Sequence, residues 1–530
     1  MSSERLLLSG NEAVACAACD AGVHLGTGYP GTPSTEILEA FPRFNGDAQW
    51  APNEKVALEV GIGAAFGGGR ILVTMKHVGV NVAADPLFAV SHTGVDGGLV
   101  IVSADDPGMA SSQNEQDNRR YASFAGIPLL EPSDSQEAYD LTIRGFEISE
   151  QWNSPVMLRL TTRICHSKGV VQTRTPSQPS RERGYDPDSR GRVMMPANAR
   201  PAHKRMRKRN DKIREWNENC DLNSIERGSD DLGIITSGVS YTHAREAAPD
   251  ANILKLSFTY PLPVETMGEF AASVDRCVVV EENDPYLAEA CRIHDIEVDD
   301  KPESFRFGEL NVQRVRDILN NRGETVEKRP PGRPPRLCNG CPHRSSFEVL
   351  RDLDCIVTGD IGCYTLGALQ PFDAMDTCLC MGASIGAGLG LRHSLPEKEA
   401  RRVVSVIGDS TFVHSGLTGI AEMVYNPPPT GHVVVILDNG TTAMTGLQEH
   451  PATGRDLEGA PTDQLNIENV CKAMGVDSVE TLDPRKEQHR LEVLLEQSLK
   501  TNDCTVIICR RPCVLALKKH KQLNRKDTSS

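Results

Sequence analysis

The sequence predicts an α/β fold of several domains, in which parallel sheets are flanked by helices. Near the carboxyl end, apolar runs at Val403–Ile407 and Val433–Leu437 enclose a helix-like stretch, the pattern of a strand, a crossover helix and a parallel strand. Strand-like runs also alternate with helical patterns over residues 1–175. The length of 530 residues allows three or four domains, so more than one such sheet is expected.

Shifts in composition divide the chain into six segments. Strand-like pieces separated by helical patterns mark the domains, and polar or Pro- and Arg-rich stretches mark the linkers. The basic run HKRMRKR at residues 203–209 suggests nucleic-acid binding, but the acids that follow it favour a solvated linker helix. The expected segments are an α/β domain (1–175), a linker with a helix (176–228), a small α/β domain (229–300), a linker (301–335), a second large α/β domain (336–517) and a tail (518–530).

Composition places the protein among ordinary globular proteins. The chain is 39% hydrophobic and 24% charged, and its formal net charge of −15 argues against nucleic acid as a partner. No apolar stretch approaches the length that spans a bilayer, and the start MSSERLLLSG is too short and polar for a secretory signal. A cytoplasmic protein with no membrane association is therefore expected.

Polar residues follow both strands of the carboxyl-terminal pair. Gly408-Asp409-Ser410 ends the first strand, and Asp438-Asn439 ends the second. Because neighbouring parallel strands end at the same edge of a sheet, Asp409 and Asn439 could meet at one Mg²⁺ ion, together with a backbone carbonyl near Thr441. Oxygens of a diphosphate and water would complete the coordination. The plainer alternative is an ordinary strand–helix–strand unit with a Gly-Asp turn.

This arrangement resembles the thiamine diphosphate signature, whose usual form is Gly-Asp-Gly, a spacer of this length and a pair of asparagines. Here Ser410 replaces the third glycine and Asp438 the first asparagine, as in 2-oxoacid:acceptor oxidoreductases. The resemblance implies a thiamine diphosphate-binding fold in which residues 336–517 bind the diphosphate. The cofactor contacts that it implies in this segment are Gly382, Gly408, Asp409, Ser410, Asn439, Thr441 and Met444.

A second resemblance lies near the amino end, in the loop Tyr29-Pro30-Gly31-Thr32-Pro33-Ser34-Thr35. We expect this loop to open a helix, with Ser34 or Thr35 as its N-cap. It resembles a loop of 2-oxoacid:ferredoxin oxidoreductases in which the threonine, here Thr32, contacts the substrate carboxylate. Glu54 stands where that family places the glutamate that bonds the aminopyrimidine ring, so residues 1–175 are expected to bind the pyrimidine. The alternative for an isolated glutamate is a solvated acid at a helix start.

Other segments carry the resemblance along almost the whole chain. RLCNGCPHR (336–344), GDIGCYTLG (359–367) and MGASIG (381–386) resemble the large subunits of indolepyruvate ferredoxin oxidoreductases. The resemblance implies oxidative decarboxylation of a 2-oxoacid, typically an arylpyruvate such as indolepyruvate, to an acyl-CoA. It also implies a small partner subunit, coenzyme A, ferredoxin or another one-electron acceptor, and a homodimeric core within a heterotetramer. A loop at residues 103–122 resembles one that faces the active site, and His77, His92 and Arg119 are expected near the substrate.

Sixteen cysteines in a chain with no export signal are not easily read as disulfides. Cys338 and Cys341 form a CxxC loop, and zinc would require a second such pair, which does not follow. In related oxidoreductases such a loop helps to bind an iron–sulfur cluster, which implies one [4Fe–4S] cluster with Cys363 as the third ligand. The fourth ligand is left open among Cys378, Cys380 and Cys471. The alternative is a tight turn with reduced thiols.

The large subunits of this family usually continue into a ferredoxin-like tail with repeated CxxCxxCxxxCP, and this sequence contains no such run. Electrons are then expected to leave through another subunit, by a proximal cluster alone, or not at all. Two other functions stay open at this point. The first is a thiamine-dependent 2-oxoacid decarboxylase that releases an aldehyde, and the second is a non-catalytic scaffold subunit.

Overall fold

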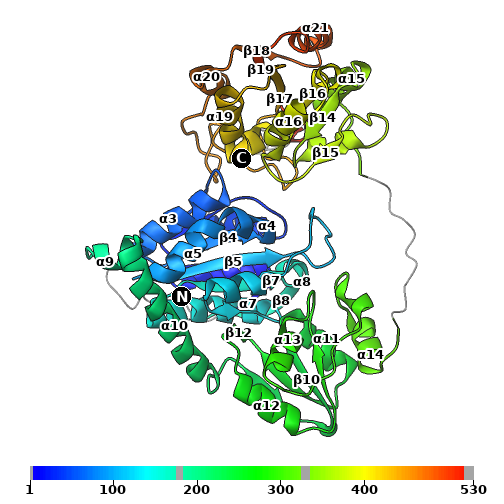
Figure 1. Ribbon diagram of the computed structural model, residues 1–530. Helices are drawn as coiled ribbons and strands as arrows, with labels where there is room; N and C mark the ends of the chain where they lie inside the picture. The colour runs from blue at the N-terminus through cyan, green and yellow to red at the C-terminus, as the bar shows by residue number, and fades with distance from the viewer. Residues whose placement is uncertain (1–3, 175–182, 324–334, 519–530) are drawn as a thin grey trace, which may run out of the picture. The chain divides into compact units, whose positions relative to one another are not determined.

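The computed structural model describes residues 4–174, 183–323 and 335–518 (Figure 1). Its internal contacts separate two units, residues 1–328 and 329–530. Within the described segments, no helix is both long and apolar enough to cross a membrane. The predicted α/β fold with parallel sheets is confirmed in each unit.

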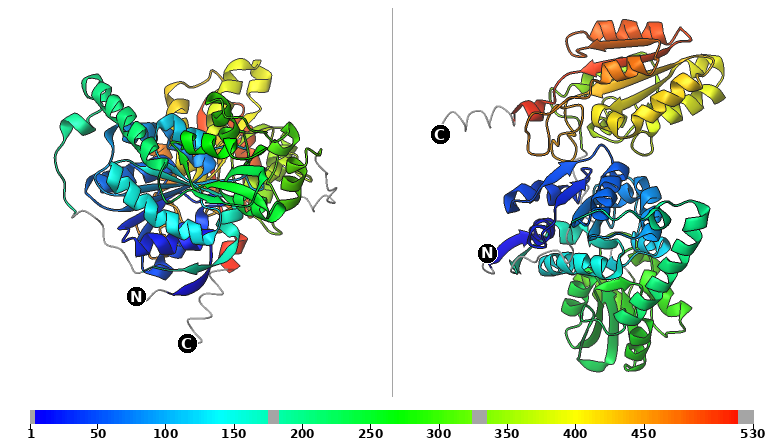
Figure 2. Two further views of the ribbon diagram at one scale, coloured as in Figure 1. Left: turned by 90° about the horizontal axis from the view of Figure 1, so that it is seen from below. Right: turned by 90° about the vertical axis from the view of Figure 1, so that its left-hand side faces the viewer.

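The centre of the first unit is a seven-stranded sheet in the order β12-β6-β7-β5-β4-β2-β3. All of its neighbours are parallel except β12, which runs antiparallel to β6. Every residue of β4, β5 and β7 is buried, because helices pack on both faces of the sheet (Figure 2). The strands are β2 (Leu25–Gly28), β3 (Ala48–Trp50), β4 (Ile71–Lys76), β5 (Leu99–Asp105), β6 (Leu129–Leu130), β7 (Val156–Thr161) and β12 (Phe258–Tyr260).

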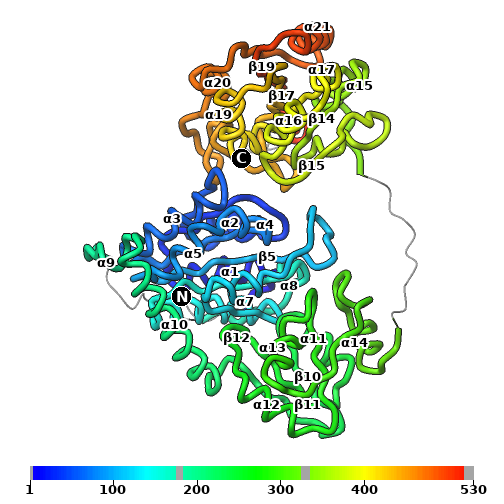
Figure 3. The backbone as a smooth tube through the Cα atoms, in the orientation of Figure 1, coloured from blue at the N-terminus to red at the C-terminus, as the bar shows by residue number. Residues whose placement is uncertain are grey.

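Helices and a small antiparallel sheet surround these strands. α1 packs along α7, as the tube in Figure 3 shows, and the paired strands β1 and β8 lie next to them. The helices are α1 (Gly10–Asp20), α2 (Thr35–Ala40), α3 (Glu54–Phe66), α4 (His77–Val82), α5 (Ala84–Thr93), α6 (Arg119–Ala125), α7 (Ser135–Trp152) and α8 (Thr162–His166), with β1 (Arg5–Ser9), β8 (Lys168–Gln172) and the 3₁₀ turn η1 (Phe41–Phe44).

The rest of the first unit holds a second, four-stranded sheet in the order β13-β10-β11-β9. The basic run at residues 203–209 lies on α10, with most of its charged side chains exposed, as expected of a solvated helix. One expectation was wrong: residues 258–260 do not continue the small sheet but form β12 of the larger one, because the chain breaks at Ser257 and pairs with β6. The elements are α9 (Ser189–Arg192), α10 (Pro196–Asn217), β9 (Ser224–Glu226), β10 (Ser229–Ser237), α11 (Val239–Ala247), β11 (Ala251–Leu256), α12 (Val264–Ala272), β13 (Cys277–Val280), α13 (Tyr286–Ile293), η2 (Glu303–Arg306) and α14 (Val312–Leu319).

The second unit is built on a six-stranded, entirely parallel sheet in the order β15-β14-β16-β17-β19-β18. Apolar side chains from both faces of its central strands form two separate cores under the helices. The elements are α15 (His343–Asp352), β14 (Ile356–Gly359), η3 (Cys363–Ala368), β15 (Thr377–Cys378), α16 (Ala383–Ser394), α17 (Glu397–Ala400), β16 (Val403–Gly408), α18 (Asp409–Thr411), the π-helical turn η4 (Phe412–Gly416), α19 (Leu417–Tyr425), β17 (His432–Asp438), α20 (Ile467–Ala473), β18 (Ser478–Leu482), α21 (Gln488–Ser498) and β19 (Cys504–Arg510).

Candidate cofactor site

Asp409 and Asn439 lie side by side in the second unit, as the sequence predicts. β16 and β17 are parallel neighbours, with Gly408 opposite Leu437, so the next residues leave the same edge of the sheet. The backbone N–H of Gly440 donates to Asp409 Oδ2 at 2.7 Å, and that of Ser410 donates to Oδ1 at 2.9 Å. Asp409 and Asn439 are only 2% and 7% exposed, so both side chains are held in place.

Two histidines control the ionisation of Asp409 and the orientation of the Asn439 amide. His450 accepts a hydrogen bond from the Ala452 backbone at Nδ1, and its Nε2 lies 3.4 Å from Asp409 Oδ2. Burial tends to raise the pKa of Asp409, but His450 and the two backbone donors hold it below its ordinary value. The Asp409 carboxylate is therefore an anion, as a Mg²⁺ ligand must be.

The second histidine, His343, orients the amide of Asn439. Burial lowers the pKa of His343 to about 4, so its ring is neutral and Nε2 can accept from Asn439 Nδ2 at 3.3 Å. The amide oxygen of Asn439 then faces the other way, where it accepts from the Thr441 backbone at 3.1 Å. Neither histidine was assigned a role from the sequence, because each lies far along the chain from the residue that it contacts.

The loop after β17 is fixed by further hydrogen bonds. The Thr441 hydroxyl donates to the Gln448 carbonyl at 3.1 Å, and the hydroxyls of Ser410 and Thr442 lie 2.8 Å apart. Met444, in contrast, is 51% exposed. Within the described part of the chain, no three His, Cys, Asp or Glu side chains could hold a metal ion by themselves. The donor set here, one carboxylate and one amide, instead fits Mg²⁺, which keeps most of its coordination for diphosphate oxygens and water.

Gly382 lies where the backbone must turn before α16. Its φ of +88° is left-handed, and a Cβ there would lie 2.4 Å from Ser415 Cβ. Asp360 holds this turn, because its carboxylate accepts from the backbone N–H groups of Gly382 at 2.9 Å and Ser384 at 3.1 Å. Gly408 is similarly closed in, since a Cβ on it would lie 2.6 Å from Tyr364 Cε1. Both predicted glycines are thus positions where no side chain fits.

In the first unit, Thr32 and Glu54 follow neighbouring strands. β2 and β3 are parallel, with Gly28 opposite Trp50, so both loops leave the same edge. Glu54 is the first residue of α3 and is only 5% exposed, which makes the interpretation as a solvated acid wrong. A Cβ on Gly79 would lie 2.6 Å from Glu54 Oε1, so the glutamate occupies space that this glycine leaves open.

One of the two expected caps, Ser34, is the N-cap residue of α2, although it makes no side-chain cap. Its hydroxyl donates to the Gly31 carbonyl at 2.9 Å and accepts no hydrogen bond from the helix. Thr35 is already the first helical residue. The hydroxyl turns back because Ser34 has an αR backbone, in which it cannot reach the next turn. Thr32 itself is half-buried.

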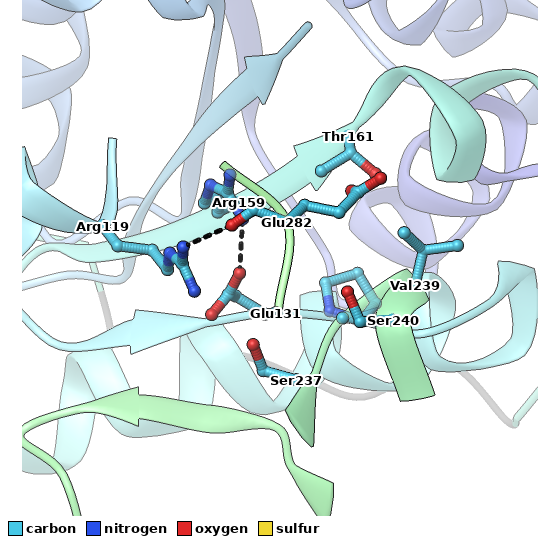
Figure 4. A pocket seen from close by; sticks show the side chains of 10 residues that line it. Arg119, Glu131, Arg159, Thr161, Ser237, Val239, Ser240 and Glu282 are labelled. Atoms are coloured by element: carbon cyan, nitrogen blue, oxygen red, sulfur yellow. Dashed lines mark hydrogen bonds and ion pairs between the residues drawn. The ribbon is translucent and has the colours of Figure 1, made fainter. Parts of the chain in front are cut away.

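Arg119 was expected near the substrate, and the structure places it in a buried ion network instead. Arg119 is 1% exposed and bonds Asp117 at 2.9 Å and Glu281 at 2.6 Å. Figure 4 shows it with Arg159 around a cavity of about 10 Å³, at the junction of the two sheets of this unit. The network fastens the small sheet to the large one, and each nitrogen of the Arg119 guanidinium already donates to a protein group.

The two histidines of this region also have structural partners. His77 is fully buried, and its Nε2 contacts the Asn114 carbonyl at 3.2 Å. His92 contacts the Phe88 carbonyl at 2.9 Å, and its ring centroid lies 5.3 Å from that of His203 on α10. The ring of His92 thus faces the linker helix, and its expected role near the substrate stays a prediction.

The comparisons with known proteins agree with this geometry. Residues 16–219 match the family described as "Pyruvate flavodoxin/ferredoxin oxidoreductase, thiamine diP-bdg", and residues 360–509 match "Thiamine pyrophosphate enzyme, C-terminal TPP binding domain". The chain is 38% identical to the indolepyruvate oxidoreductase subunit IorA of Archaeoglobus fulgidus, over 97% of this chain and 87% of the relative. The IorA of Thermococcus kodakarensis is 39% identical, over 97% of this chain and 86% of its own length.

The chain belongs to the indolepyruvate oxidoreductase IorA family. The resemblance inferred from the motifs is thereby confirmed, and with it a thiamine diphosphate-binding fold and a subunit of a 2-oxoacid oxidoreductase. The 2-oxoglutarate synthase subunit KorA of Methanothermobacter marburgensis is 26% identical over 53% of the chain and 88% of its own length. A solved 2-oxoglutarate:ferredoxin oxidoreductase from Magnetococcus marinus has a TM-score of 0.49 at 17% identity, covering 60% of this chain and 65% of its own, too low a likeness to support an argument.

Four thiols of this IorA-family chain lie close together beside the loop after β17. Burial raises the pKa of Cys341 to about 12, and the nearby thiols Cys363, Cys338 and Cys513 raise it further. Burial likewise raises the pKa of Cys363 to about 11, with contributions from Cys513 and Cys338. The backbone N–H of Cys513 donates to the Asn439 carbonyl at 2.9 Å, which ties this group to the loop after β17.

The sequence did not point to Cys513 as a fourth member. The residues left open instead lie elsewhere: Cys471 is buried in α20 against the other core, and Cys378 and Cys380 lie near Asp360. One signal could have identified Cys513, because it follows β19, the parallel neighbour of β17, at the edge of the sheet that carries Asn439. All sixteen cysteines are free thiols.

Proposed function

We propose that this chain is the catalytic subunit of an arylpyruvate oxidoreductase that binds thiamine diphosphate with Mg²⁺ and uses indolepyruvate or a similar 2-oxoacid. The proposed reaction is oxidative decarboxylation to an acyl-CoA, with electrons passed one at a time to ferredoxin or another acceptor. The observation that carries the proposal is the pairing of Asp409 and Asn439 at the ends of adjacent parallel strands, in a chain of the IorA family.

The residues of the second unit would hold the metal and the diphosphate. Asp409 and Asn439 supply two Mg²⁺ ligands, with the Thr441 carbonyl as a third. His450 keeps the Asp409 carboxylate ionised. His343 binds the amide nitrogen of Asn439, so the amide oxygen points away from the His343 ring. Gly382 and Gly408 leave backbone rather than side chains next to the anionic group, and Ser410 and Met444 are proposed as further contacts.

The first unit would supply the acid–base group and part of the substrate site. Bound thiamine diphosphate provides a carbon nucleophile that adds to the ketone and takes up the electrons released with carbon dioxide. Glu54, held at the start of α3, shares a proton with the pyrimidine ring nitrogen and so increases the basicity of the ring's amino group. The Thr32 hydroxyl donates to the substrate carboxylate.

The four neighbouring cysteines offer a path for the electrons. We propose that the thiolates of Cys338, Cys341, Cys363 and Cys513 would hold one [4Fe–4S] cluster, which would supply a one-electron carrier. The support is the proximity of the four thiols and the link from Cys513 to the Asn439 loop. Free thiols throughout the chain suit the reducing cytoplasm, where we place the protein.

Partners complete the proposal. The IorA relatives are named as subunits, so a small second subunit is expected, and it is the proposed source of the rest of the coenzyme A site. We also propose a homodimeric core within a heterotetramer. Light scattering on the purified large subunit should give about twice the mass of one chain, and the mass of a single chain would contradict a homodimer.

The test is anaerobic turnover of indolepyruvate and phenylpyruvate with thiamine diphosphate, Mg²⁺, coenzyme A, the co-expressed small subunit and a one-electron dye. Acyl-CoA and aldehyde are both measured. Glu54→Gln should lower turnover about 10²- to 10⁴-fold. The matched control is Glu59→Gln on the same helix, whose side chain is 44% exposed and which should stay near wild type. Aldehyde without dye reduction would indicate a decarboxylase, and failure to bind thiamine diphosphate would indicate a scaffold subunit.

A further inference from the structure

Lys76 is a buried cation at the edge of the large sheet that carries Thr32. It is the last residue of β4, which lies between β2 and β5 in the sheet. The loop after β2 contains Thr32, and the loop after β5 covers the other side. Lys76 is only 8% exposed, which is unusual for a lysine and requires compensation of its charge.

The alkyl chain of Lys76 lies against the Thr32 loop. A Cβ on Gly31 would lie 3.0 Å from Lys76 Cβ and 3.6 Å from its Cδ, so the missing side chain at residue 31 makes room for the lysine. Thr32 follows directly. The ammonium group is therefore anchored between this loop and the loop after β5, where Nζ donates to the Ser111 carbonyl at 2.9 Å.

This one hydrogen bond leaves the ammonium incompletely satisfied. An ammonium has three donors, and no carboxylate lies within ion-pair distance of Lys76 in the ranges that the structure describes. The charge of Asp106 acts on Lys76, but the Asp106 carboxylate already accepts from the Ser111 backbone at 2.8 Å and from Thr162 Oγ1 at 2.8 Å. The adjacent His77 has its Nε2 at the Asn114 carbonyl. An anion is the ligand that this surrounding lacks.

We propose that Lys76 binds the carboxylate of the 2-oxoacid substrate, together with the hydroxyl of Thr32. The inference rests on the proposed function, since it assigns a residue to the same substrate site. A lysine serves as a point charge with rotatable donors, so it can follow the carboxylate without the fixed fork of an arginine. Burial lowers the pKa of Lys76 to about 8, against a smaller opposite effect of Asp106, so the ammonium is charged at neutral pH.

The test compares Lys76→Met with Lys76→Arg and with Lys212→Met, an exposed lysine on α10, as the control for loss of one charge. We expect Lys76→Met to raise KM for arylpyruvates at least tenfold and to leave thiamine diphosphate binding unchanged. Calorimetry with 3-phenylpropanoate and its neutral amide supplies a readout without turnover. Wild type and Lys212→Met should prefer the carboxylate, Lys76→Arg should keep part of that preference, and Lys76→Met should lose it.

The KM of the wild type should also rise as the pH passes about 8, because the Lys76 ammonium loses its proton there. The KM of Lys76→Arg should not change above that pH, because arginine stays protonated. The pH dependence of KM in wild type and Lys76→Arg tests the inference even if Lys76→Met does not fold. The inference is overturned if wild type turns over arylpyruvates and Lys76→Met keeps its KM, or if wild type binds acid and amide equally. A wild type that prefers the carboxylate but turns over no arylpyruvate refutes the proposed function and leaves the anion site standing.

Discussion

Replacing Arg119 by methionine should destabilise the first unit by about 3–5 kcal/mol, the cost of breaking a buried ion pair. The side chain is 1% exposed and bonds Asp117 at 2.9 Å and Glu281 at 2.6 Å, while its other donors reach the backbone of Glu282. Methionine fills the volume but leaves two buried carboxylates without their partner. At roughly 2–4 °C per kcal/mol for a large domain, the melting temperature should fall by about 6–20 °C.

The assay is thermal and denaturant unfolding of the full chain by circular dichroism. The adjacent Arg120→Met is the control, because Arg120 pairs with Glu289 on the surface, with side chains 45% and 39% exposed. Such a pair contributes under about 1 kcal/mol. If Arg119→Met stays within 1 kcal/mol of wild type, or matches Arg120→Met, the network is not a structural fastening and the original placement of Arg119 near the substrate regains support.

The same network gives a signed pH dependence. Burial tends to raise the pKa of Asp117, but Arg119 and Arg159 hold it at about 2. Because this folded pKa lies below the ordinary value of 3.8, the contribution of Asp117 to stability is fully present above about pH 4 and is lost as the pH falls toward 2. Acid titration of Arg119→Met should show a smaller decline, because Arg159 alone then lowers the pKa of Asp117. Parallel unfolding curves from pH 5 to 2 can measure the difference.

Three further outcomes are expected in the second unit. Asp409→Asn should weaken Mg²⁺-dependent binding of thiamine diphosphate at least about tenfold, as measured by calorimetry. The control Asp438→Asn should bind nearly as wild type, because the Asp438 carboxylate faces Arg510. Equal binding by both variants would contradict the metal assignment. Cys341→Ser should contain no iron or acid-labile sulfide and should not reduce the dye, while thiamine diphosphate still binds. Cys355→Ser is the control. Iron retained by Cys341→Ser would exclude the cluster. Gly382→Ala should destabilise the unit by about 1–2 kcal/mol or more, because of the left-handed φ and the Ser415 contact, and a wild-type unfolding curve would contradict that strain.

The sequence predicted the parts of the site that depend on strand ends. Asp409 and Asn439 follow apolar runs, and parallel neighbours must end at one edge, so their meeting required no knowledge of the rest of the fold. Thr32 and Glu54 were identified by resemblance, and the structure adds that they follow the neighbouring parallel strands β2 and β3. Gly382 was identified by resemblance alone, and only the structure gives its reason, a left-handed turn tied to Asp360.

The residues that sequence reasoning missed or misplaced have partners distant in the chain. Arg119 bonds Glu281 from another sheet, and Cys513 reaches the Asn439 loop only because β19 pairs with β17. No local pattern distinguishes an arginine that binds a substrate from one that neutralises a buried acid, since both require a loop near an anion. What separates them is how far the donors are already used: every guanidinium nitrogen of Arg119 donates to a protein group, whereas Lys76 Nζ donates to a single carbonyl. The hydrogen bonds that each cation makes in the folded chain, rather than its residue type, therefore move the expected substrate contact from Arg119 to Lys76.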